Sequence, residues 1–302
     1  MALAQESSRL KASDFPQEVL ALFDQYVHGL IDRRGFMDGA SRFTAGGMTA
    51  SVMFDALRPH YEWAQQVPPG DARVRTEYVT YPSPQGHGTM RGLMAWPENA
   101  TGPFPTVLVI HENRGLNPYI EDVVRRFAAA GFLSFGPDAL TPLGGYPGND
   151  DDGRDMQRQL DRDKVTNDFL AAAGFLMEHQ DSTGRVGAVG FCFGGGMVNT
   201  LAVRLPDLGA AVPFYGGQPP ADQVSGIEAP LMIHYAGLDE RINAGWPAYR
   251  AALDAAGKVY TMYMYENTNH GFHNDTTPRY DEAAAQLAQE RTIAFFREHL
   301  AS

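Results

Sequence analysis

The sequence contains a single cysteine, Cys192, among its 302 residues. One thiol cannot form an internal disulfide, so cysteine usage points to neither a reducing nor an oxidising compartment. Long apolar runs are also missing, because no stretch approaches the roughly 20 consecutive apolar residues that a membrane-spanning helix requires. The sequence therefore predicts a soluble protein that has no membrane as its partner.

Basic residues are scarce, with 24 Lys and Arg against 36 Asp and Glu, for a formal net charge of −12. Nucleic-acid binding draws most of its strength from Lys and Arg that neutralise phosphates, so this acidic chain disfavours a nucleic-acid partner. A small-molecule partner fits better. The hydrophobic content of 44% supports one large core with an appendage, and it leaves the oligomeric state open, with a homodimer as one option.

From about residue 72, short apolar runs alternate with longer amphipathic segments, which is typical of strands and crossover helices. Strands are expected at 73–81, 88–96, 105–110, 132–135, 186–190, 210–215, 230–235 and 259–265. Helices are expected near 118–130, 163–178, 195–205, 246–256 and 280–299. The first two strands look like an antiparallel pair, and the later runs are apolar enough to be covered on both faces. The pattern predicts an α/β fold with a mostly parallel sheet of about eight strands and helices on both faces.

The first 70 residues have a different pattern. Between residues 14 and 34 the apolar positions follow helical spacing, with Asp14 as the expected cap and Pro16 in the first turn. The sequence therefore predicts an N-terminal helical extension over residues 1–70, followed by a catalytic α/β domain over residues 71–302.

Within this extension, Arg33, Arg34 and Phe36 precede a weakly apolar stretch and resemble a twin-arginine export signal. Two features depart from such a signal. Arg42 interrupts the apolar stretch, and Glu62 occupies a position where signal peptidase prefers a small residue. We therefore expect a structural helical arm and a cytoplasmic protein, with export to the periplasm as the alternative.

Cys192 lies in the segment GFCFGGG, which follows the apolar run VGAV and precedes an expected helix. This is the context of a nucleophile elbow, in which Gly190 and Gly194 let strand and helix backbones approach closely while strained dihedrals push the nucleophile out of the sheet. The start of a helix also favours a thiolate over a thiol. An inert core cysteine is the alternative, and the glycine frame argues against it.

An elbow nucleophile requires a base and a carboxylate that orients the base, in the chain order nucleophile, acid, histidine. Asp239 and His270 follow Cys192 in that order, and each comes just after an expected strand, where open α/β sheets collect their sites. Glu240 is a rival for the acid and His273 a rival for the base. His270 and His273 do not predict a metal site, because no third ligand accompanies them.

The segment HENRGL directly follows the expected strand at 105–110 and supplies the remaining part of the site. An oxyanion hole is normally built from the N–H after the nucleophile and one from this loop, so the N–H groups of Phe193 and Asn113 are the expected donors. Glu112 ends a buried strand, where an isolated carboxylate is costly. We expect Arg114 or the Cys192 thiol to be its partner.

The four segments GFCFGGG, HENRGL, GLDERI and NHGFHN occur together in order, and over about residues 72–300 the chain resembles the dienelactone hydrolase family. These carboxymethylenebutenolidases are α/β-hydrolases with a cysteine nucleophile. The resemblance implies an α/β-hydrolase fold and a triad of Cys192, His270 and Asp239 that opens a lactone or ester through an acyl-thiol intermediate. It also implies that Glu112 helps to form the thiolate when substrate binds, and that no cofactor or metal is required.

The sequence departs from this family where the substrate is held. The family binds a substrate carboxylate with arginines, one of them four residues after the catalytic histidine, and here that position is Asn274. Arg154 or Arg158 would be a substitute, unless both belong to a solvated helix face. The stretch 140–169 is a candidate flap over the site. Candidate substrate-binding residues are Arg114, Tyr146, Arg154, Tyr215 and Trp246.

Two other functions remain open on the same scaffold. One is a general carboxylesterase that acts on a different ester or lactone with changed acid-binding groups. The other is a non-catalytic small-molecule binding protein, such as a sensor that reacts with electrophiles through Cys192. The joint presence of Asp239 and His270 argues against the sensor, because a binding module needs no such pair.

Overall fold

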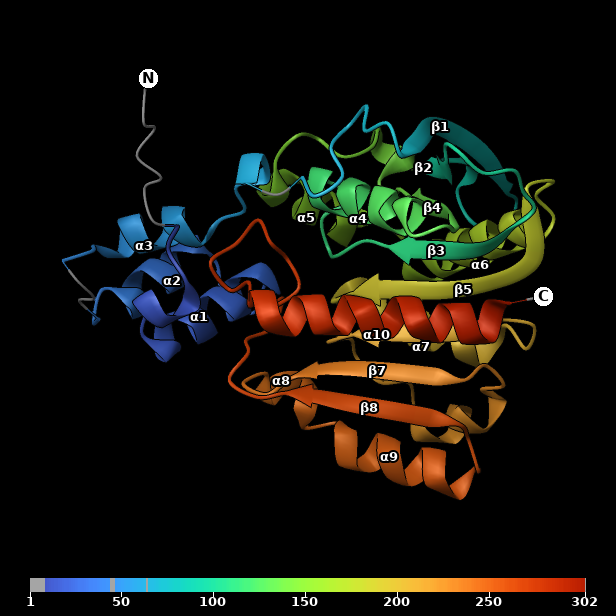
Figure 1. Cartoon of the computed structure of the whole chain (residues 1–302). Coiled ribbons are helices and arrows are strands. Elements are labelled where there is room, and N and C mark those ends of the chain that lie inside the picture. The colour runs from blue at the N-terminus through green and yellow to red at the C-terminus, as the bar shows by residue number, and fades with distance from the viewer. Residues whose placement is uncertain (1–8, 44–46, 64, 302) are drawn as a thin grey trace.

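The computed structural model describes residues 9–43, 47–63 and 65–301. Its centre is an eight-stranded sheet with the strand order β1-β2-β4-β3-β5-β6-β7-β8 (Figure 1). The strands are β1 Val74–Ser83, β2 Gly88–Pro97, β3 Phe104–Ile110, β4 Leu133–Pro137, β5 Ser182–Phe191, β6 Ala210–Phe214, β7 Leu231–Ala236 and β8 Tyr260–Tyr265. Strand β2 is antiparallel to both β1 and β4, and the other neighbours are parallel. The predicted α/β architecture and its opening antiparallel pair are confirmed.

The central strands are buried because helices cover both faces of the sheet. Every residue of β6 and β7 is buried, as the continuous apolar runs predicted. Strand β8 differs, since only its last residue, Tyr265, is buried. The expectation that this strand is covered on both faces is wrong, and the reason is its place at the edge of the sheet, where a neighbouring strand is lacking on one side.

Helices on the two faces form two separate hydrophobic clusters with the sheet. Residues of α4 (Pro118–Ala129) and α10 (Glu282–Leu300) share one cluster, which includes Val123 and Phe296. Residues of α6 (Arg162–Met177), α7 (Phe193–Arg204) and α9 (Trp246–Ala255) share the other, which includes Leu176, Val198 and Leu253. All five helices start and end within a few residues of the sequence-based expectation.

The stretch 140–169 is mostly helical. It contains the short 3-10 helix η3 (Thr141–Leu143), the helix α5 (Asp150–Gln159) and the first half of α6. The sequence indicated a helix only from residue 163 and left 150–159 as part of a flap or as a solvated helix face, because this segment contains one apolar residue, Met156. Helix α5 forms because the side chain of Asn149 accepts a hydrogen bond from the Asp152 N–H, and because three acidic residues in the first turn favour the helix start.

The N-terminal extension is helical, as predicted. Its elements are η1 Ala12–Asp14, α1 Gln17–Val27, α2 Arg33–Ala40, α3 Ala50–Leu57 and η2 Tyr61–Trp63. They form a third hydrophobic cluster around the rings of Phe23, Phe36 and Phe54. The expected cap is wrong: Pro16 is the N-cap of α1, because the carboxylate of Asp14 accepts a hydrogen bond from the Lys11 N–H within η1.

Part of the apolar stretch of the resembled export signal, at residues 44–46, lies outside the described residues. The separate cluster agrees with an extension that ends near residue 70, and that boundary stays a prediction. No helix within the described ranges is both long and apolar enough to cross a membrane.

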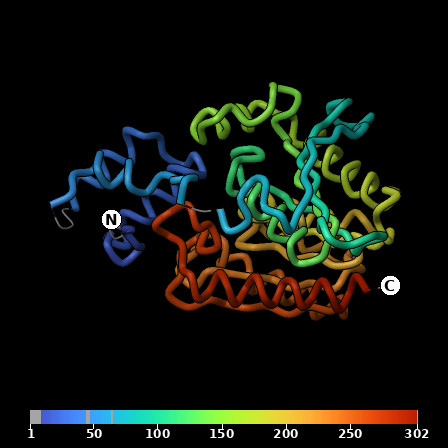
Figure 2. Tube along the Cα trace, turned by 45° about the horizontal axis from the view of Figure 1, so that its top comes forward, coloured from blue at the N-terminus to red at the C-terminus, as the bar shows by residue number. Residues whose placement is uncertain are grey.

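The extension lies against the end of the sheet to which the parallel strands point (Figures 1 and 2). Several hydrogen bonds hold it there, and three of them come from widely spaced parts of the extension. The Gln17 amide donates to Asn269 Oδ1 over 2.7 Å, the Asn113 amide donates to the carbonyl of Val27 over 2.7 Å, and the His60 N–H donates to a backbone carbonyl of the 269–281 segment over 2.8 Å. The extension therefore contacts the edge where α/β sheets collect their sites.

Candidate active site

Cys192 sits on a sharp turn between β5 and α7. Its backbone has φ 56° and ψ −112°, outside the conformations that a helix or strand uses. The flanking glycines are required by space, because a Cβ on Gly190 would lie 2.2 Å from the carbonyl oxygen of Gly194, and a Cβ on Gly194 would lie 2.3 Å from that of Ile110. This geometry presents the thiol at the carboxyl edge of the sheet.

Asp239 and His270 meet at the same edge. Asp239 follows β7 and is the N-cap of the short helix α8 (Glu240–Asn243), and its Oδ2 atom lies 2.6 Å from His270 Nδ1. Burial acts to raise the pKa of Asp239, but the charge of His270 and the hydrogen bond from its ring outweigh burial and lower this pKa. His270 Nε2 is buried and has no hydrogen-bond partner among the described residues.

The two rivals lie outside this pair. Glu240 is exposed at the start of α8. The ring of His273 is buried between two other elements, with Nδ1 2.7 Å from the hydroxyl of Tyr119 and Nε2 3.2 Å from Gln289 Oε1. Burial, followed by the charge of Arg126, lowers the pKa of His273 to about 3.

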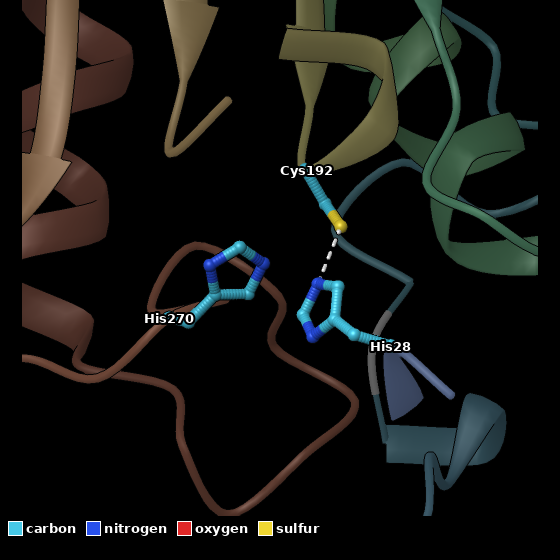
Figure 3. Close-up of side chains that lie close together, drawn as sticks. All are labelled: His28, Cys192 and His270. Atoms are coloured by element: carbon cyan, nitrogen blue, oxygen red, sulfur yellow. Dashed lines mark hydrogen bonds between the residues drawn. The ribbon is translucent and has the colours of Figure 1, made fainter. Parts of the chain in front are cut away.

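A second histidine, which the sequence analysis missed, reaches the thiol from the N-terminal extension (Figure 3). The Nε2 atom of His28 lies 3.3 Å from Cys192 Sγ. Its Nδ1 atom lies 2.7 Å from the carbonyl oxygen of Asp24 and 3.2 Å from the Asp24 carboxylate. The rings of His28 and His270 stand edge to face, with centroids 4.7 Å apart. The one available signal was the spacing of Asp24 and His28, which places both on one face of a helix.

Arg241 lies beside both histidines. Its Nη2 atom is 3.0 Å from His28 Nε2 and 3.5 Å from His270 Nδ1, and its Nε atom is 3.4 Å from an Asp24 carboxylate oxygen. This arginine comes from the GLDERI segment, two residues after Asp239. It places a permanent positive charge next to the thiol and both imidazoles.

The three groups in Figure 3 are also of the types that bind a metal ion. One ligand atom from each of His28, Cys192 and His270 lies within 4.8 Å of the others. His28 lies far from His270 in the chain, and the sequence offered His273 as the neighbour of His270, so this group was not predicted. A guanidinium 3.0 Å from His28 Nε2 opposes a second cation at this position, since like charges at such a distance repel. We therefore keep the expectation that the protein requires no metal.

The hydrogen-bond partner of Glu112 is a residue that was not expected from the sequence. Its Oε2 atom accepts a hydrogen bond of 3.0 Å from Asn274 Nδ2. Arg114, one of the two expected partners, is instead paired with Asp150 across 2.9 Å. That expectation fails because Asp150 belongs to α5, the helix that the sequence did not reveal. Burial acts to lower the pKa of Arg114, but the charges of Asp150 and Glu112 outweigh burial and raise it.

The expected oxyanion donors lie next to the nucleophile. Asn113 and Phe193 both line the cavity that contains Cys192. Neither of their N–H groups donates a hydrogen bond within the described part of the chain. The side chain of Asn113 is anchored on Val27 of α1, so the extension helps to fix this loop.

The cavity at Cys192 has a volume of about 560 Å³. It lies between the elbow, the end of α1 and the helices α5 and α6. Four arginines line it, namely Arg154, Arg158, Arg162 and Arg241.

Two of the five candidate substrate-binding residues line this cavity, Arg154 and Tyr215. The other three are placed by different contacts. Arg114 pairs with Asp150, the hydroxyl of Tyr146 donates to the same carboxylate over 3.1 Å, and Trp246 packs its ring against Tyr235, Tyr249 and Tyr260. The structure therefore does not bring these three to the thiol.

The strand order, the turn at Cys192 and the positions of Asp239 and His270 after β7 and β8 define an α/β-hydrolase. Residues 90–300 match the model of the dienelactone hydrolase family, and residues 6–46 match a model described as YqhI-like. The chain belongs to the dienelactone hydrolase family, and it is a hydrolase that acts on ester or lactone bonds.

Individual relatives agree with this assignment. The chain is 55% identical over 114 residues to the "Putative hydrolase fragment YghX" of Escherichia coli, which covers 38% of this chain and 97% of that protein. It is 30% identical over 244 residues to a "Putative carboxymethylenebutenolidase" of Saccharolobus solfataricus, covering 69% and 93%. The crystal structure of a "Putative Dienelactone Hydrolase" from Klebsiella pneumoniae superposes with a TM-score of 0.65 at 25% identity, covering 74% and 99%.

Proposed function

We propose that this protein hydrolyses lactones or small esters with Cys192 as nucleophile, His270 as acid–base group and Asp239 as the carboxylate that orients His270. The observation that carries the proposal is the 2.6 Å contact between His270 Nδ1 and Asp239 Oδ2, beside a thiol held on an elbow. That contact fixes the tautomer in which Nε2 carries a lone pair for proton transfer.

The reaction proceeds in two halves. The thiolate of Cys192 adds to the ester carbonyl, and the oxyanion that forms is stabilised by the N–H groups of Asn113 and Phe193. Collapse of this intermediate breaks the C–O bond and leaves an acyl-thiol, which water then hydrolyses with His270 as base. In a lactone, the alcohol that leaves remains attached to the acyl group, so the product is a single hydroxy acid.

The cavity favours a substrate that carries a negative charge. Four arginines line it, although the family position at Asn274 holds no arginine. Arg154 is buried and contacts Asp151 over 3.1 Å. Arg241 contacts Asp24 over 3.4 Å, but 37% of its side chain stays exposed and it lines the cavity, which leaves it accessible to a substrate carboxylate. We therefore propose an anionic lactone or ester, and a panel including cis- and trans-dienelactone and their methyl esters tests the charge requirement directly.

The N-terminal extension bears on where the protein is located, because it contributes residues to the active site. Phe36 is fully buried in the hydrophobic cluster of the extension, and Arg33 and Arg34 begin α2. Cleavage of an export signal after this region would remove His28 from the active site. We therefore propose a cytoplasmic protein, and cell fractionation followed by N-terminal sequencing checks this. A periplasmic protein that begins after residue 60 would contradict it.

Turnover of p-nitrophenyl acetate by the full chain tests the catalytic proposal. We expect Cys192→Ala to abolish turnover above background and Asp239→Asn to lower it by about 10²–10⁴-fold, because the imidazole loses its orienting charge. His270→Gln is expected to lose turnover to a similar degree. His273→Gln is the matched control, since that ring contacts Tyr119 and Gln289 and not the thiol.

The outcomes separate the alternatives. Turnover by Cys192→Ala equal to that of the wild type would exclude a thiol enzyme. Binding of small electrophiles at Cys192 without turnover by the wild type would identify the sensor instead. Equal rates for charged and methylated dienelactones would indicate a general carboxylesterase.

A further inference from the structure

We propose that the N-terminal extension supplies a second catalytic pair, Asp24 and His28, and that His28 is the base that takes the proton of the Cys192 thiol. This inference rests on the proposed function, because it assigns the first proton transfer of the same reaction. It also gives His270 a separate role, in the second half of the reaction.

The two histidine–carboxylate pairs are arranged alike around one sulfur. Asp239 faces His270 Nδ1, and Asp24 faces His28 Nδ1 through both its carbonyl and its carboxylate. In each ring a protonated Nδ1 leaves the Nε2 lone pair for proton transfer. His28 Nε2 contacts Cys192 Sγ at 3.3 Å and Arg241 Nη2 at 3.0 Å, while His270 Nε2 has no hydrogen-bond partner among the described residues. In the resting enzyme the thiol proton therefore faces His28.

The local sequence determines the position of His28. It is the C-cap of α1, where the helix dipole favours a positive charge, so the imidazolium formed by proton transfer is stabilised. Gly29 follows with φ 72°, a conformation that ends the helix and suits glycine. The adjacent Tyr26 hydroxyl donates to an Asp151 carboxylate oxygen over 2.7 Å, and Arg154 lies 3.0 Å from that hydroxyl. These contacts hold the end of α1 over the elbow.

The charges that face His28 come from three directions. Asp24 lies on the same helix, Cys192 lies at the elbow, Arg241 lies on α8 after β7, and His270 lies on the loop after β8. Burial acts to lower the pKa of His28, but the negative charge of Cys192 and the hydrogen bonds with Asp24 and Cys192 outweigh burial and raise it. Arg241 holds a permanent positive charge 3.0 Å from His28 Nε2.

The proton balance closes with the two bases in sequence. His28 accepts the thiol proton, sulfur bonds to the carbonyl carbon, and the carbonyl electron pair moves to oxygen. When the C–O bond breaks, the departing alkoxide takes that proton from His28. His270 Nε2 then accepts a proton from water as the water oxygen attacks the acyl-thiol, the C–S bond breaks, and the thiolate recovers a proton from His270. One water is consumed for each bond that is hydrolysed.

Because the chain has one cysteine, alkylation by iodoacetamide reports on Cys192 alone. In the full chain we expect His28→Gln to slow both alkylation at neutral pH and the burst of p-nitrophenolate from p-nitrophenyl acetate by at least about tenfold. Asp24→Asn is expected to slow both to a smaller degree. His270→Gln is expected to keep the burst and alkylation rates and to lose steady-state turnover, because the acyl-thiol accumulates.

His60→Gln and Asp55→Asn are the matched controls. Both make the same chemical changes in the extension, and neither side chain reaches the cavity: Asp55 is exposed, and the ring of His60 stacks on Trp63. Both variants are expected to behave as the wild type. His28→Ala with added imidazole provides a second route, since recovery of the burst by imidazole supports the proposal even where the glutamine variant is destabilised.

Two results would overturn the inference. The first is a wild-type burst and alkylation rate in His28→Gln together with loss of both in His270→Gln, which would make His270 the sole base. The second is a His28→Ala variant that melts at the wild-type temperature, is slow, and gains nothing from imidazole, which would leave His28 with a purely structural part. Failure of the proposed function gives a different signature, namely turnover that persists in Cys192→Ala.

Discussion

Glu112 and Asn274 are joined by a 3.0 Å hydrogen bond that links the loop after β3 to the loop after β8. Both side chains are buried. The family resemblance implies that Asn274 occupies the position of a substrate-binding arginine. Here its amide donates to a carboxylate of the protein itself. We therefore predict that this position influences the reaction through Glu112.

Replacement of Asn274 by alanine is expected to destabilise the protein by about 1–3 kcal/mol, because the Glu112 carboxylate would remain buried without this donor. Urea denaturation followed by tryptophan fluorescence measures the change. Asn167→Ala is the control, since its amide bonds an exposed backbone carbonyl, and a cost within about 0.5 kcal/mol is expected there. If both variants lost the same free energy of unfolding, the hydrogen bond between Asn274 and Glu112 would not be important for stability.

Replacement of Glu112 by glutamine tests the charge without removing the contact. The new side chain keeps an oxygen that can accept from Asn274, so we expect folding to be retained. Loss of the negative charge is expected to slow formation of the acyl-thiol by about tenfold or more. Stopped-flow measurement of thiolate absorbance with and without substrate checks this, with Glu98→Gln as an exposed control. A thiolate signal that is the same in the Glu112→Gln variant and in the wild type would remove Glu112 from the reaction.

The buried imidazole of His273 predicts a loss of stability in acid. Its pKa is lowered from 6.5 to about 3 by burial and by Arg126. Between these values the unfolded chain binds a proton at this position and the folded chain does not, so the free energy of unfolding falls as the pH drops through this window. One such group contributes a slope of at most about 1.4 kcal/mol per pH unit.

His273→Gln removes this titration, so we expect the variant to lose less stability than the wild type between pH 6.5 and about 3. Urea denaturation at several pH values measures the two slopes. His234, whose pKa burial also lowers, remains in both proteins and accounts for a part of the slope that does not change. Parallel curves for the two proteins would mean that His273 binds its proton at the same pH in the folded and the unfolded chain.

The sequence predicted the strands and the Cys192, His270 and Asp239 positions because local patterns determine them. Apolar runs mark buried strands, and glycines on both sides of Cys192 indicate a tight approach of two backbones. Position in the chain then places Asp239 and His270 at strand ends. These inferences need no knowledge of which surface packs on which.

The sequence did not predict His28, because its role depends on where α1 docks. Asp24 and His28 lie on the face of an amphipathic helix that its apolar pattern assigns to solvent. Long-range contacts, among them those of Asn113 and Arg241, turn that face toward the thiol. The same holds for the Asn274 partner of Glu112, which is 162 residues distant in the chain. Polar contacts between residues that are far apart in the chain produce no periodic pattern in the sequence.

Gly29 directly follows His28 at the end of α1. Replacing Gly29 by alanine tests whether the position of the His28 ring matters apart from backbone strain. Gly29 has φ 72°, and a Cβ there would lie 1.9 Å from a guanidinium nitrogen of Arg158. Gly257 follows α9 in the same way with φ 62°, and nothing lies within 4 Å of its Cβ position.

Both alanine variants are expected to lose about 1–2 kcal/mol of stability from the left-handed backbone. Only Gly29→Ala must also displace Arg158 or the end of α1, so only this variant is expected to slow the p-nitrophenolate burst and the alkylation of Cys192. Equal burst rates in the two variants would show that Arg158 moves aside and leaves the end of α1 in place, whereas a slow burst in Gly29→Ala alone would tie the reactivity of Cys192 to the helix that carries His28.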